Sequence, residues 1–460
     1  MGFIHITDAT AAGLTEAVQQ FLAKLGIDMK RVRGQGYDGA SVMSGIRGGV
    51  QKLIKNVVGE NIPVPYVHCS SHNLNLVIND AVESNTQAAG FFNTIQKVYK
   101  YFSKSLNRWA ELALGAKTAD SLKLKKLCPT RWTSRIDSVR AIKNRYTDIM
   151  RVLTRISLQG KTKDERDDSM ALRKQLESFE FIVFLVLWER LLLSIKKASV
   201  ELQSPQLDLC AALRLLSMAE NELRILRNSW ESILSTALDM SKTWGVTPEF
   251  QHKRDRTIKK FFDELASDER LRDPEKAFKV NIFYAVVDTA LMQLRERFCG
   301  QGLVSDTFSF LFPKNLTQLS DEEVETPCRN LCDLYKEDFE NADDLISEVR
   351  SFKNEFSEEL KEKSTVTDII NILLSSHIAS SMPELLSLCI LFVTLPVTVA
   401  SAERSFSKLK LIKNYLRSTM AQDRLDGLAV VAIENNEARK IDLDKVIRAF
   451  ANMKARRKDF

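Results

Sequence analysis

A glycine-punctuated change from strand to helix at residues 31–45, RVRGQGYDGASVMSG, constrains the fold of this chain more than any other stretch. Apolar residues predict a strand at 29–33, and apolar residues at helical spacing predict a helix over 40–54. Between them stand three glycines that let the backbone approach its neighbours closely: Gly34, Gly36 and Gly39. The stretch therefore predicts a strand that ends in a crowded turn.

Asp38 lies in this turn and has two interpretations. At the carboxyl end of a strand, its carboxylate can point into the crevice where α/β sheets bind metals and phosphates. Alternatively, Asp38 closes the turn and caps the helix that begins at Gly39. The stretch by itself favours capping, and only a segment near the other end of the chain changes that balance.

Composition sets broad limits on the class of protein. A chain of 460 residues that is 44% hydrophobic and 27% charged is globular and long enough for two or three domains. Its longest apolar runs are too short to span a membrane, and its start lacks the pattern of a secretory signal. Seven scattered cysteines suit free thiols in a reducing compartment. The net charge of +6 is compatible with a nucleic-acid partner without proving one.

Strand and helix signals alternate through the first 85 residues. Strands are predicted at residues 3–6 and 64–67, and helices at residues 11–25 and 72–81, the first of them capped by Thr10. This alternation predicts a partly parallel sheet flanked by helices. Three short strands are few for a complete sheet, so we expect only part of a domain here.

Helix signals dominate after residue 87. Long helices are predicted across residues 170–240, and the charged runs at 161–168 (KTKDERDD) and 320–327 (SDEEVETP) predict solvated loops. The basic run at 252–260, HKRDRTIKK, has two interpretations, which are phosphate contact and a solvated helix face.

The second important segment is residues 395–420, LPVTVASAERSFSKLKLIKNYLRSTM. A short extended segment is predicted at 395–399, followed by a helix that starts at Ser401 and carries Glu403. Taken alone, Glu403 is explained as an acid in the first turn of a helix, where the helix dipole favours it.

Together these segments resemble the hAT superfamily of transposases and the cellular proteins descended from them. GYDGASVMSG resembles the segment around that family's second catalytic aspartate, which puts the role on Asp38. HCSSHNLNLVI resembles the family's Cys-x-x-His motif, here Cys69 and His72. CPTRWTSR resembles its Arg-Trp motif, here Arg131 and Trp132, and these four residues are the expected DNA-binding set.

A fourth motif completes the resemblance. SAERSFSKLKLIKNYLRSTM, continuing to LDGLAVVAIENN, resembles the family's C-terminal dimerisation region, whose glutamate closes the active site and matches Glu403. Four motifs in the right order are far more specific than one. The strongest likeness is to host proteins of this group, including zinc-finger MYM-type relatives.

The resemblance implies an α/β fold that is mostly α, in which a partial ribonuclease H-like core is interrupted by a large all-helical insertion. Residues 1–134 would form the first part of the core, and residues 135–385 the insertion. Residues 386–460 would hold the end of the core and the dimerisation region.

The resemblance also implies a metal-dependent active site. Strand-transfer nucleases hold two divalent metals about 4 Å apart with acidic side chains, and Asp38 and Glu403 would be two of the carboxylates. The family's first aspartate lies on a strand upstream of where this chain begins, and Asp8 does not occupy that position. The family's N-terminal DNA-binding domain is missing as well. We therefore expect an inactive site with no cofactor, which would take Mg²⁺ or Mn²⁺ only if the carboxylate triad were complete.

Other roles remain open at this point. A zinc site at Cys69 and His72 is disfavoured because no second Cys/His pair follows at finger spacing, so the resemblance assigns the pair a structural role near DNA. Trp132 stacks on an unpaired base or covers the core. The apolar face at residues 425–433 packs on a partner subunit, as the family implies, or on the chain's own core.

Two functions from different classes follow. The first is a domesticated hAT-like protein in the nucleus that forms a homodimer or higher oligomer through its C-terminal region and regulates in association with DNA. The second is a DNA-cleaving and strand-transferring transposase that needs its missing N-terminal part. The nucleus, self-association and DNA contact come from the family, and no membrane partner is expected.

Overall fold

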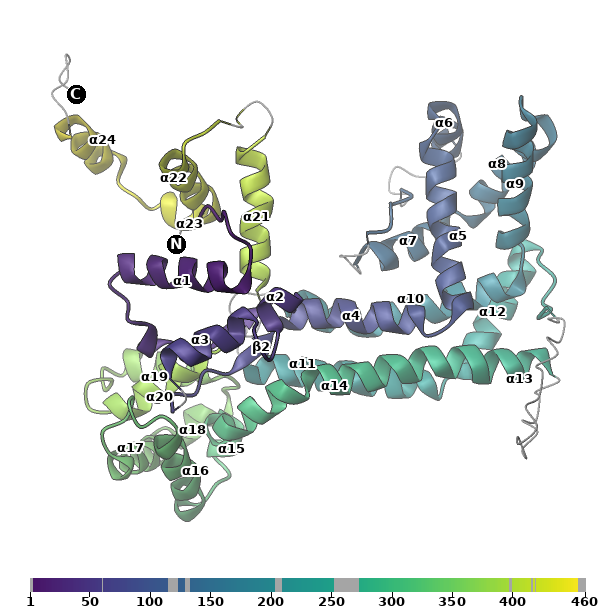
Figure 1. The fold of residues 1–460 in the computed structure, drawn as a ribbon. Coiled ribbons are helices and arrows are strands. Elements are labelled where there is room, and N and C mark those ends of the chain that lie inside the picture. The colour runs from purple at the N-terminus through teal and green to yellow at the C-terminus, as the bar shows by residue number, and fades with distance from the viewer. Residues whose placement is uncertain are drawn as a thin grey trace, which may run out of the picture. The chain divides into compact units, whose positions relative to one another are not determined.

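The computed structural model describes residues 3–59, 61–114, 123–128, 133–202, 209–251, 273–396, 399–414, 417 and 419–453. It is mostly helical, with few strands (Figure 1). The chain divides into two compact units. Unit 1 comprises Met1–Cys69, Cys332–Glu340 and Thr394–Phe460, and unit 2 comprises Ser70–Leu331 and Asn341–Val393. The three domains expected from the resemblance stay a prediction.

The described part of unit 1 holds a small parallel sheet. Strand β1 (Gln35–Tyr37) pairs with β2 (Tyr66–His68), and Tyr37 lies opposite His68 in the register. The expected parallel pairing is confirmed. The prediction of a strand at residues 3–6 is wrong, because these residues form no strand.

The prediction of a strand at residues 29–33 is also wrong. Met29–Arg31 forms a 3₁₀ turn, η1, because the Asp28 carboxylate accepts a hydrogen bond from the Lys30 backbone N–H at 2.9 Å. Met29 and Val32 nevertheless pack against the core of unit 1, so a turn and the residue after it, rather than a strand, bring these partly buried apolar side chains to the core.

Helices accompany the sheet. Helix α1 (Ala11–Lys24) is capped by Thr10 as predicted, since the Thr10 side chain accepts from the Gly13 N–H. The single helix expected over 40–54 is broken into α2 (Ser41–Ser44) and α3 (Val50–Val58). Glycines cause the break: a Cβ at Gly49 would lie 2.4 Å from the Gly45 nitrogen. Buried apolar residues from α3 to Val64 form the core here, with residues of α1 packed against them.

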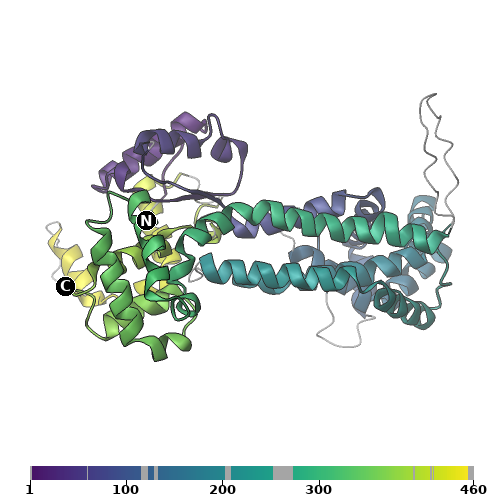
Figure 2. The same cartoon turned by 90° about the horizontal axis from the view of Figure 1, so that it is seen from below.

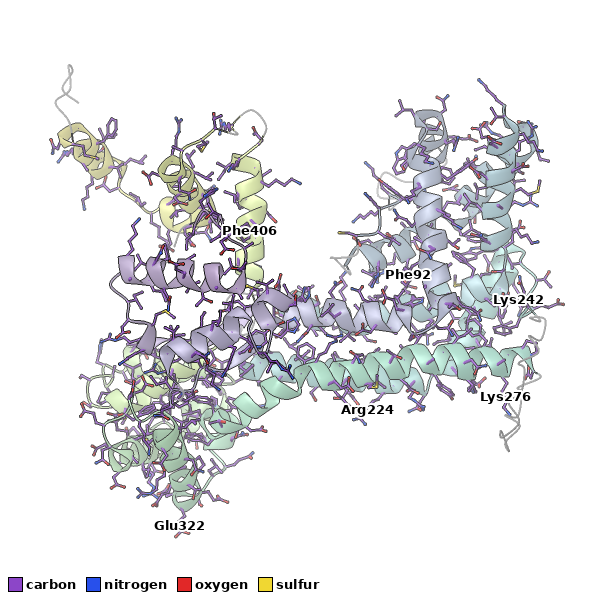
Figure 3. The ribbon with its side chains drawn as sticks, viewed as in Figure 1. Phe92, Arg224, Lys242, Lys276, Glu322 and Phe406 are labelled. Atoms are coloured by element: carbon purple, nitrogen blue, oxygen red, sulfur yellow. The ribbon has the colours of Figure 1, made fainter. Side chains whose placement is uncertain are left out.

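The C-terminal helices of unit 1 are α21 (Ala400–Ile412), α22 (Gln422–Ile433), α23 (Asn435–Ala438) and α24 (Leu443–Asn452). Helices α21 and α22 pack together. Both ends of the Phe3 backbone are held by α22, because its N–H donates to Asp426 at 2.9 Å and its carbonyl accepts from Gln422 at 2.7 Å. The Phe3 ring meets the edge of Phe406, which is labelled on α21 (Figure 3), at 5.7 Å.

Unit 2 consists of helices in its described residues. In chain order they are α4 (Ser70–Glu83), α5 (Thr86–Ser103), α6 (Leu106–Leu114), α7 (Thr133–Asn144), α8 (Tyr146–Gln159), α9 (Lys163–Leu176), α10 (Phe179–Glu201), α11 (Leu209–Arg227), α12 (Trp230–Trp244), α13 (Pro274–Phe278), the π-helix η2 (Lys279–Tyr284), α14 (Ala285–Phe308), η3 (Ser309–Leu311), α15 (Pro313–Leu316), α16 (Asp321–Leu334), α17 (Ala342–Glu355), α18 (Ser357–Lys361), α19 (Val366–Ser375) and α20 (Pro383–Thr394). The last residues of α16 and α20 belong to unit 1.

Helix α10 forms the centre of unit 2. It packs against α7, α11 and α12, and its run from Phe181 to Trp188 is buried without interruption. Helix α14 packs along α4 and α11, and Figure 2 shows the green α14 beside the teal α11. None of the helices in the described residues is both long and apolar enough to cross a membrane.

Both charged runs expected to be loops are helix starts instead. Helix α9 begins at Lys163, where the Thr162 side chain accepts from the Glu165 N–H, and α16 begins at Asp321. Acidic residues fill the first turn of each helix, where the helix dipole stabilises negative charge. The charge that predicted a loop therefore belongs to the helix N-terminus.

Truncating the buried Trp188 should destabilise unit 2. Its ring is fully buried and lies 4.8 Å from the Phe92 ring, so Trp188→Ala removes a large core side chain and should cost about 3–5 kcal/mol. Met218→Ala, at an exposed position on α11, is the matched control and should stay within about 0.5 kcal/mol. Urea unfolding followed by circular dichroism measures both, and equal midpoints would contradict the proposed core.

Candidate functional site

The carboxyl ends of β1 and β2 form one edge of the sheet, because the two strands run parallel. Asp38 directly follows β1, and Cys69 directly follows β2. The Cys69 N–H donates to the Tyr37 carbonyl at 2.9 Å, which carries the backbone pairing to the end of both strands. We call this edge, with Asp38 and Cys69, the carboxyl edge.

Asp38 is exposed at the carboxyl edge. Its carboxylate accepts a hydrogen bond from the Ala40 N–H at 3.2 Å, and its carbonyl oxygen lies 3.0 Å from Nε2 of His68. Helix α2 begins after Ala40 and has no side-chain cap. Asp38 therefore closes the turn, as one interpretation predicted, but it does not cap the helix.

Gly39 is required by this turn. Its φ is +85°, in the left-handed region that favours glycine. A Cβ at Gly39 would lie 2.3 Å from the imidazole of His68, which is the last residue of β2. Both the backbone angle and the ring beside it exclude a side chain.

The two earlier glycines explain how the C-terminal segment reaches the sheet. A Cβ at Gly34 would lie 2.9 Å from Cδ of Pro396, and one at Gly36 would lie 2.8 Å from Cβ of Pro396. Residues 395–396 therefore lie directly on β1. The prediction that these glycines permit a close approach is confirmed, although the sequence did not identify Pro396 as the neighbour.

Helix α21 begins at the same edge. Val399, its N-cap residue, donates its N–H to the Cys69 sulfur at 3.3 Å. Glu403 lies one helical turn further along α21. Its side chain is not among those described, so the pairing of the Glu403 and Asp38 carboxylates stays a prediction. The structure does bring the start of the Glu403 helix to the strand end that carries Cys69.

Aromatic rings lie beside Asp38. The Tyr66 ring stacks on the Tyr37 ring, with 5.9 Å between the ring centroids, and on the His68 ring, with 6.4 Å between the centroids. Burial raises the pKa of both tyrosines to about 12, and the nearby Asp38 charge contributes for Tyr66. These tyrosines were missed by the sequence analysis, although Tyr66 and His68 alternate on β2 and so share one face of the sheet.

The other predicted site residues are buried, belong to unit 2, or lie outside the described residues. The Cys69 side chain is 1% exposed, so its sulfur is part of the packing rather than of the surface. His72 is half-buried in the first turn of α4, in unit 2. Arg131, Trp132 and the basic run at 252–260 lie outside the described residues.

Across the side chains that the structure describes, no group of three or more His, Cys, Asp or Glu residues is arranged to hold a metal ion. The exposed carboxylate of Asp38 suits a hard cation such as Mg²⁺, which prefers oxygen ligands. The buried Cys69 sulfur does not suit one, because it already accepts a backbone hydrogen bond.

Adding a side chain at Gly39 should destabilise the carboxyl edge. Gly39→Ala forces an unfavourable φ and a clash with His68, and should lower the free energy of unfolding by roughly 1–3 kcal/mol. Gly48→Ala is the matched control, because a Cβ there meets nothing within 4 Å. Thermal unfolding compares the two, and a Gly39→Ala protein as stable as the control would refute the described turn.

Tyr66 should make stability fall in alkaline solution. Below pH 10 the phenol keeps its proton in both states, whereas between pH 10 and about 12 only the folded state keeps it, so unfolding becomes easier. Tyr66→Phe should reduce the loss of stability between those pH values. Urea unfolding at a series of pH values measures this, and parallel losses in both proteins would contradict the raised pKa.

Comparison with known proteins supports the sequence resemblance. Residues 1–49 match the ZMYM1/FAM200 RNase-like domain, and residues 349–437 match the hAT family C-terminal dimerisation region. Two similar proteins are the "52 kDa repressor of the inhibitor of the protein kinase" of Mus musculus and of Homo sapiens. The mouse protein is 23% identical over 454 residues, which cover 93% of this chain and 57% of that protein. The human protein is 23% identical over 452 residues, which cover 94% of this chain and 56% of that protein.

The two matched segments contain the residues that form the candidate site. The first holds Asp38 and its glycines, and the second holds α21 with Glu403. The chain spans little more than half the length of these curated relatives. The matches confirm the resemblance to hAT transposase-derived proteins: one segment of the chain is similar to the ZMYM1/FAM200 RNase-like domain and another to the hAT family C-terminal dimerisation region.

Proposed function

We propose that this chain is the body of a domesticated hAT transposase-like protein, which acts in the nucleus as a dimerising, DNA-associated regulator without transposase activity as it stands. The observation that carries this proposal is the match of residues 349–437 to the hAT dimerisation region. The mouse and human relatives are named as repressors, which supports regulation rather than transposition.

The proposed architecture is a partial ribonuclease H-like core interrupted by a helical insertion. Its support is the composition of unit 1, which joins the segment Met1–Cys69 to Thr394–Phe460. The whole of the helical unit 2 lies between those segments in the sequence. The parallel pairing of β1 with β2 is also consistent with such a core.

The proposed DNA contacts follow from the resemblance. Arg131 and Trp132 would contact a DNA end, through phosphate attraction and base stacking respectively. Cys69 is buried, and its sulfur accepts a hydrogen bond from the Val399 N–H. We therefore propose that Cys69 positions α21 at the carboxyl edge and does not contact DNA. His72 would stabilise the first turn of α4, in which it lies.

One observation favours the alternative, a metal-dependent transposase. Asp38 and the start of α21 come to the carboxyl edge from opposite ends of the chain, which is the arrangement a carboxylate site needs. Asp38 and Glu403 would hold Mg²⁺ or Mn²⁺, which would activate water or a 3′ hydroxyl for attack on DNA. Asp8 supplies no third ligand in our proposal, because its carboxylate accepts hydrogen bonds from the Thr10 N–H at 2.8 Å and hydroxyl at 2.9 Å.

A nicking assay separates the two functions. The purified chain is incubated with a labelled DNA duplex and Mg²⁺ or Mn²⁺, beside Asp38→Asn and Glu403→Gln. We expect no metal-dependent cleavage by any of the three, and dimers in light scattering. We also expect duplex binding that weakens as salt rises, because phosphate contacts release counterions.

The variants act as matched controls for the alternative. Each replaces a carboxylate by an amide of similar shape, so it removes a metal ligand with little change in packing. Cleavage by the unmodified chain that both variants lose would overturn the regulator proposal in favour of an active enzyme. A chain that neither dimerises nor binds duplex would contradict the proposed regulator as well.

A further inference from the structure

The stretch from α5 to α7 is strongly basic. Residues 86–144 contain twelve Lys and Arg residues against three Asp and Glu residues, which is a net charge of +9. The whole chain has a net charge of +6, so its other residues together carry −3. Helix α5 itself contains no acidic residue. The excess positive charge of this chain is therefore concentrated in one stretch of unit 2.

Three lysines share one side of α5 and of its C-terminal end. Lys97, Lys100 and Lys104 are spaced by three and four residues, so they lie on the same face of the helix. All three are exposed. Ile95 and Phe102, on the other side of α5, are buried. The helix therefore presents an apolar side to the core and a basic side to solvent.

Residues 123–128 bring further lysines to this side of α5. The Leu127 N–H donates a hydrogen bond to Oε1 of Gln96 on α5 at 2.9 Å. Gln96 lies one helical turn before Lys100 and so on the same side of the helix. We define the lysine surface as the five exposed lysines of α5, its C-terminal end and this segment: Lys97, Lys100, Lys104, Lys123 and Lys126.

The acids near the lysine surface already pair with other bases: Asp137 with Lys125, Glu111 with Arg155, Glu165 with Arg108, and Glu189 with Arg140 and Lys143. Helix α9, which packs against α5, contains four acids and four bases and so adds no net charge. The remaining acid of the basic stretch, Asp120, lies outside the described residues. Within the described residues, no lysine of the lysine surface forms an ion pair. Their charge is therefore available to an external anion.

We propose that the lysine surface binds the phosphate backbone of duplex DNA. A lysine ammonium is a point charge that suits a phosphate, so the contact would position the protein without reading the base sequence. Residues 123–128 end three residues before Arg131, so the surface would hold the duplex next to the end that Arg131 and Trp132 contact. This inference rests on the proposed DNA association and gives it a surface outside the four motifs.

The aromatic residues of α5 favour a duplex over a single strand. Sites for single strands combine a basic groove with aromatic rings on which the bases stack. The rings of α5 are used in packing instead: Phe91, Phe92, Tyr101 and Phe102 are buried, and the Tyr99 ring meets the edge of the Trp109 ring, with 6.2 Å between the centroids. The lysine surface therefore offers charge without a stacking platform.

The test removes the charge of α5 in the full chain. The variant is Lys97→Ala with Lys100→Ala and Lys104→Ala, and fluorescence anisotropy measures its binding to labelled duplexes of two unrelated sequences at several salt concentrations. Each lost phosphate contact should reduce the slope of log K against log salt by about 0.9, so the slope should become shallower by roughly 2–3. Both duplexes should lose affinity equally.

Two variants serve as controls. Lys197→Ala with Lys242→Ala and Lys314→Ala removes the same charge from exposed positions on α10, α12 and α15 and should keep the slope; Lys242 is labelled in Figure 3. The corresponding Lys→Arg changes at Lys97, Lys100 and Lys104 keep the charge and should bind like the unmodified chain. Circular dichroism should show the same helix content in all variants, because every changed side chain is exposed.

The outcomes separate this inference from the proposed function. If the alanine variant of α5 keeps the original slope, or loses no more than the control on α10, α12 and α15, the lysine surface is overturned while DNA association stands. An arginine variant that binds as weakly as the alanine variant would assign these lysines a structural role and overturn it too. If the unmodified chain binds no duplex at any salt concentration, both fail. Tighter binding of a single strand of equal length, lost in the alanine variant, would assign the surface to single strands instead.

Discussion

The close approach of Pro396 to strand β1 is the contact on which the candidate site depends. It is possible only because Gly34 and Gly36 lack side chains: any Cβ there would lie within 3 Å of the proline ring. Within the described residues the sheet has two strands of three residues each, too few to be stable by themselves. The segment before α21 therefore covers β1. The hydrogen bond from the Val399 N–H to the Cys69 sulfur then holds the start of α21 at this sheet.

The sequence predicted elements whose signals were long or doubly supported. Helix α1 had both an apolar period and a capping threonine, and α4 had a sustained apolar period. Short apolar runs were misleading, since Met29 and Val32 lie in and directly after a 3₁₀ turn and are partly buried, while the actual strand contains a glycine. Period alone cannot separate these cases over a few residues. Charged runs also misled, because acids in a helix's first turn have the same composition as a loop.

The candidate site was predictable in part. Asp38 was expected near the end of a strand, but that strand is Gln35–Tyr37 and not the predicted 29–33, and the interest in α21 came only from the motif resemblance. No local signal reveals that residues more than three hundred positions apart meet, because such contacts depend on the path of the whole chain. The Tyr37 and Tyr66 rings beside Asp38 were missed for the same reason, since their stacking needs the register of β1 with β2.

The hydrogen bonds between Phe3 and α22 affect the order in which the protein can fold during synthesis. Unit 1 needs residues from both ends of the chain, so its contacts span most of the sequence and are slow to form. A ribosome releases the N-terminal segment first, and that segment cannot reach Gln422 and Asp426 until almost the whole chain has emerged. Unit 2, whose main segment Ser70–Leu331 is continuous, can assemble earlier. The apolar core around Val50 and Ile54 is packed by residues 11–64 alone, so it can form early, whereas the contacts of Phe3 with α22 form last.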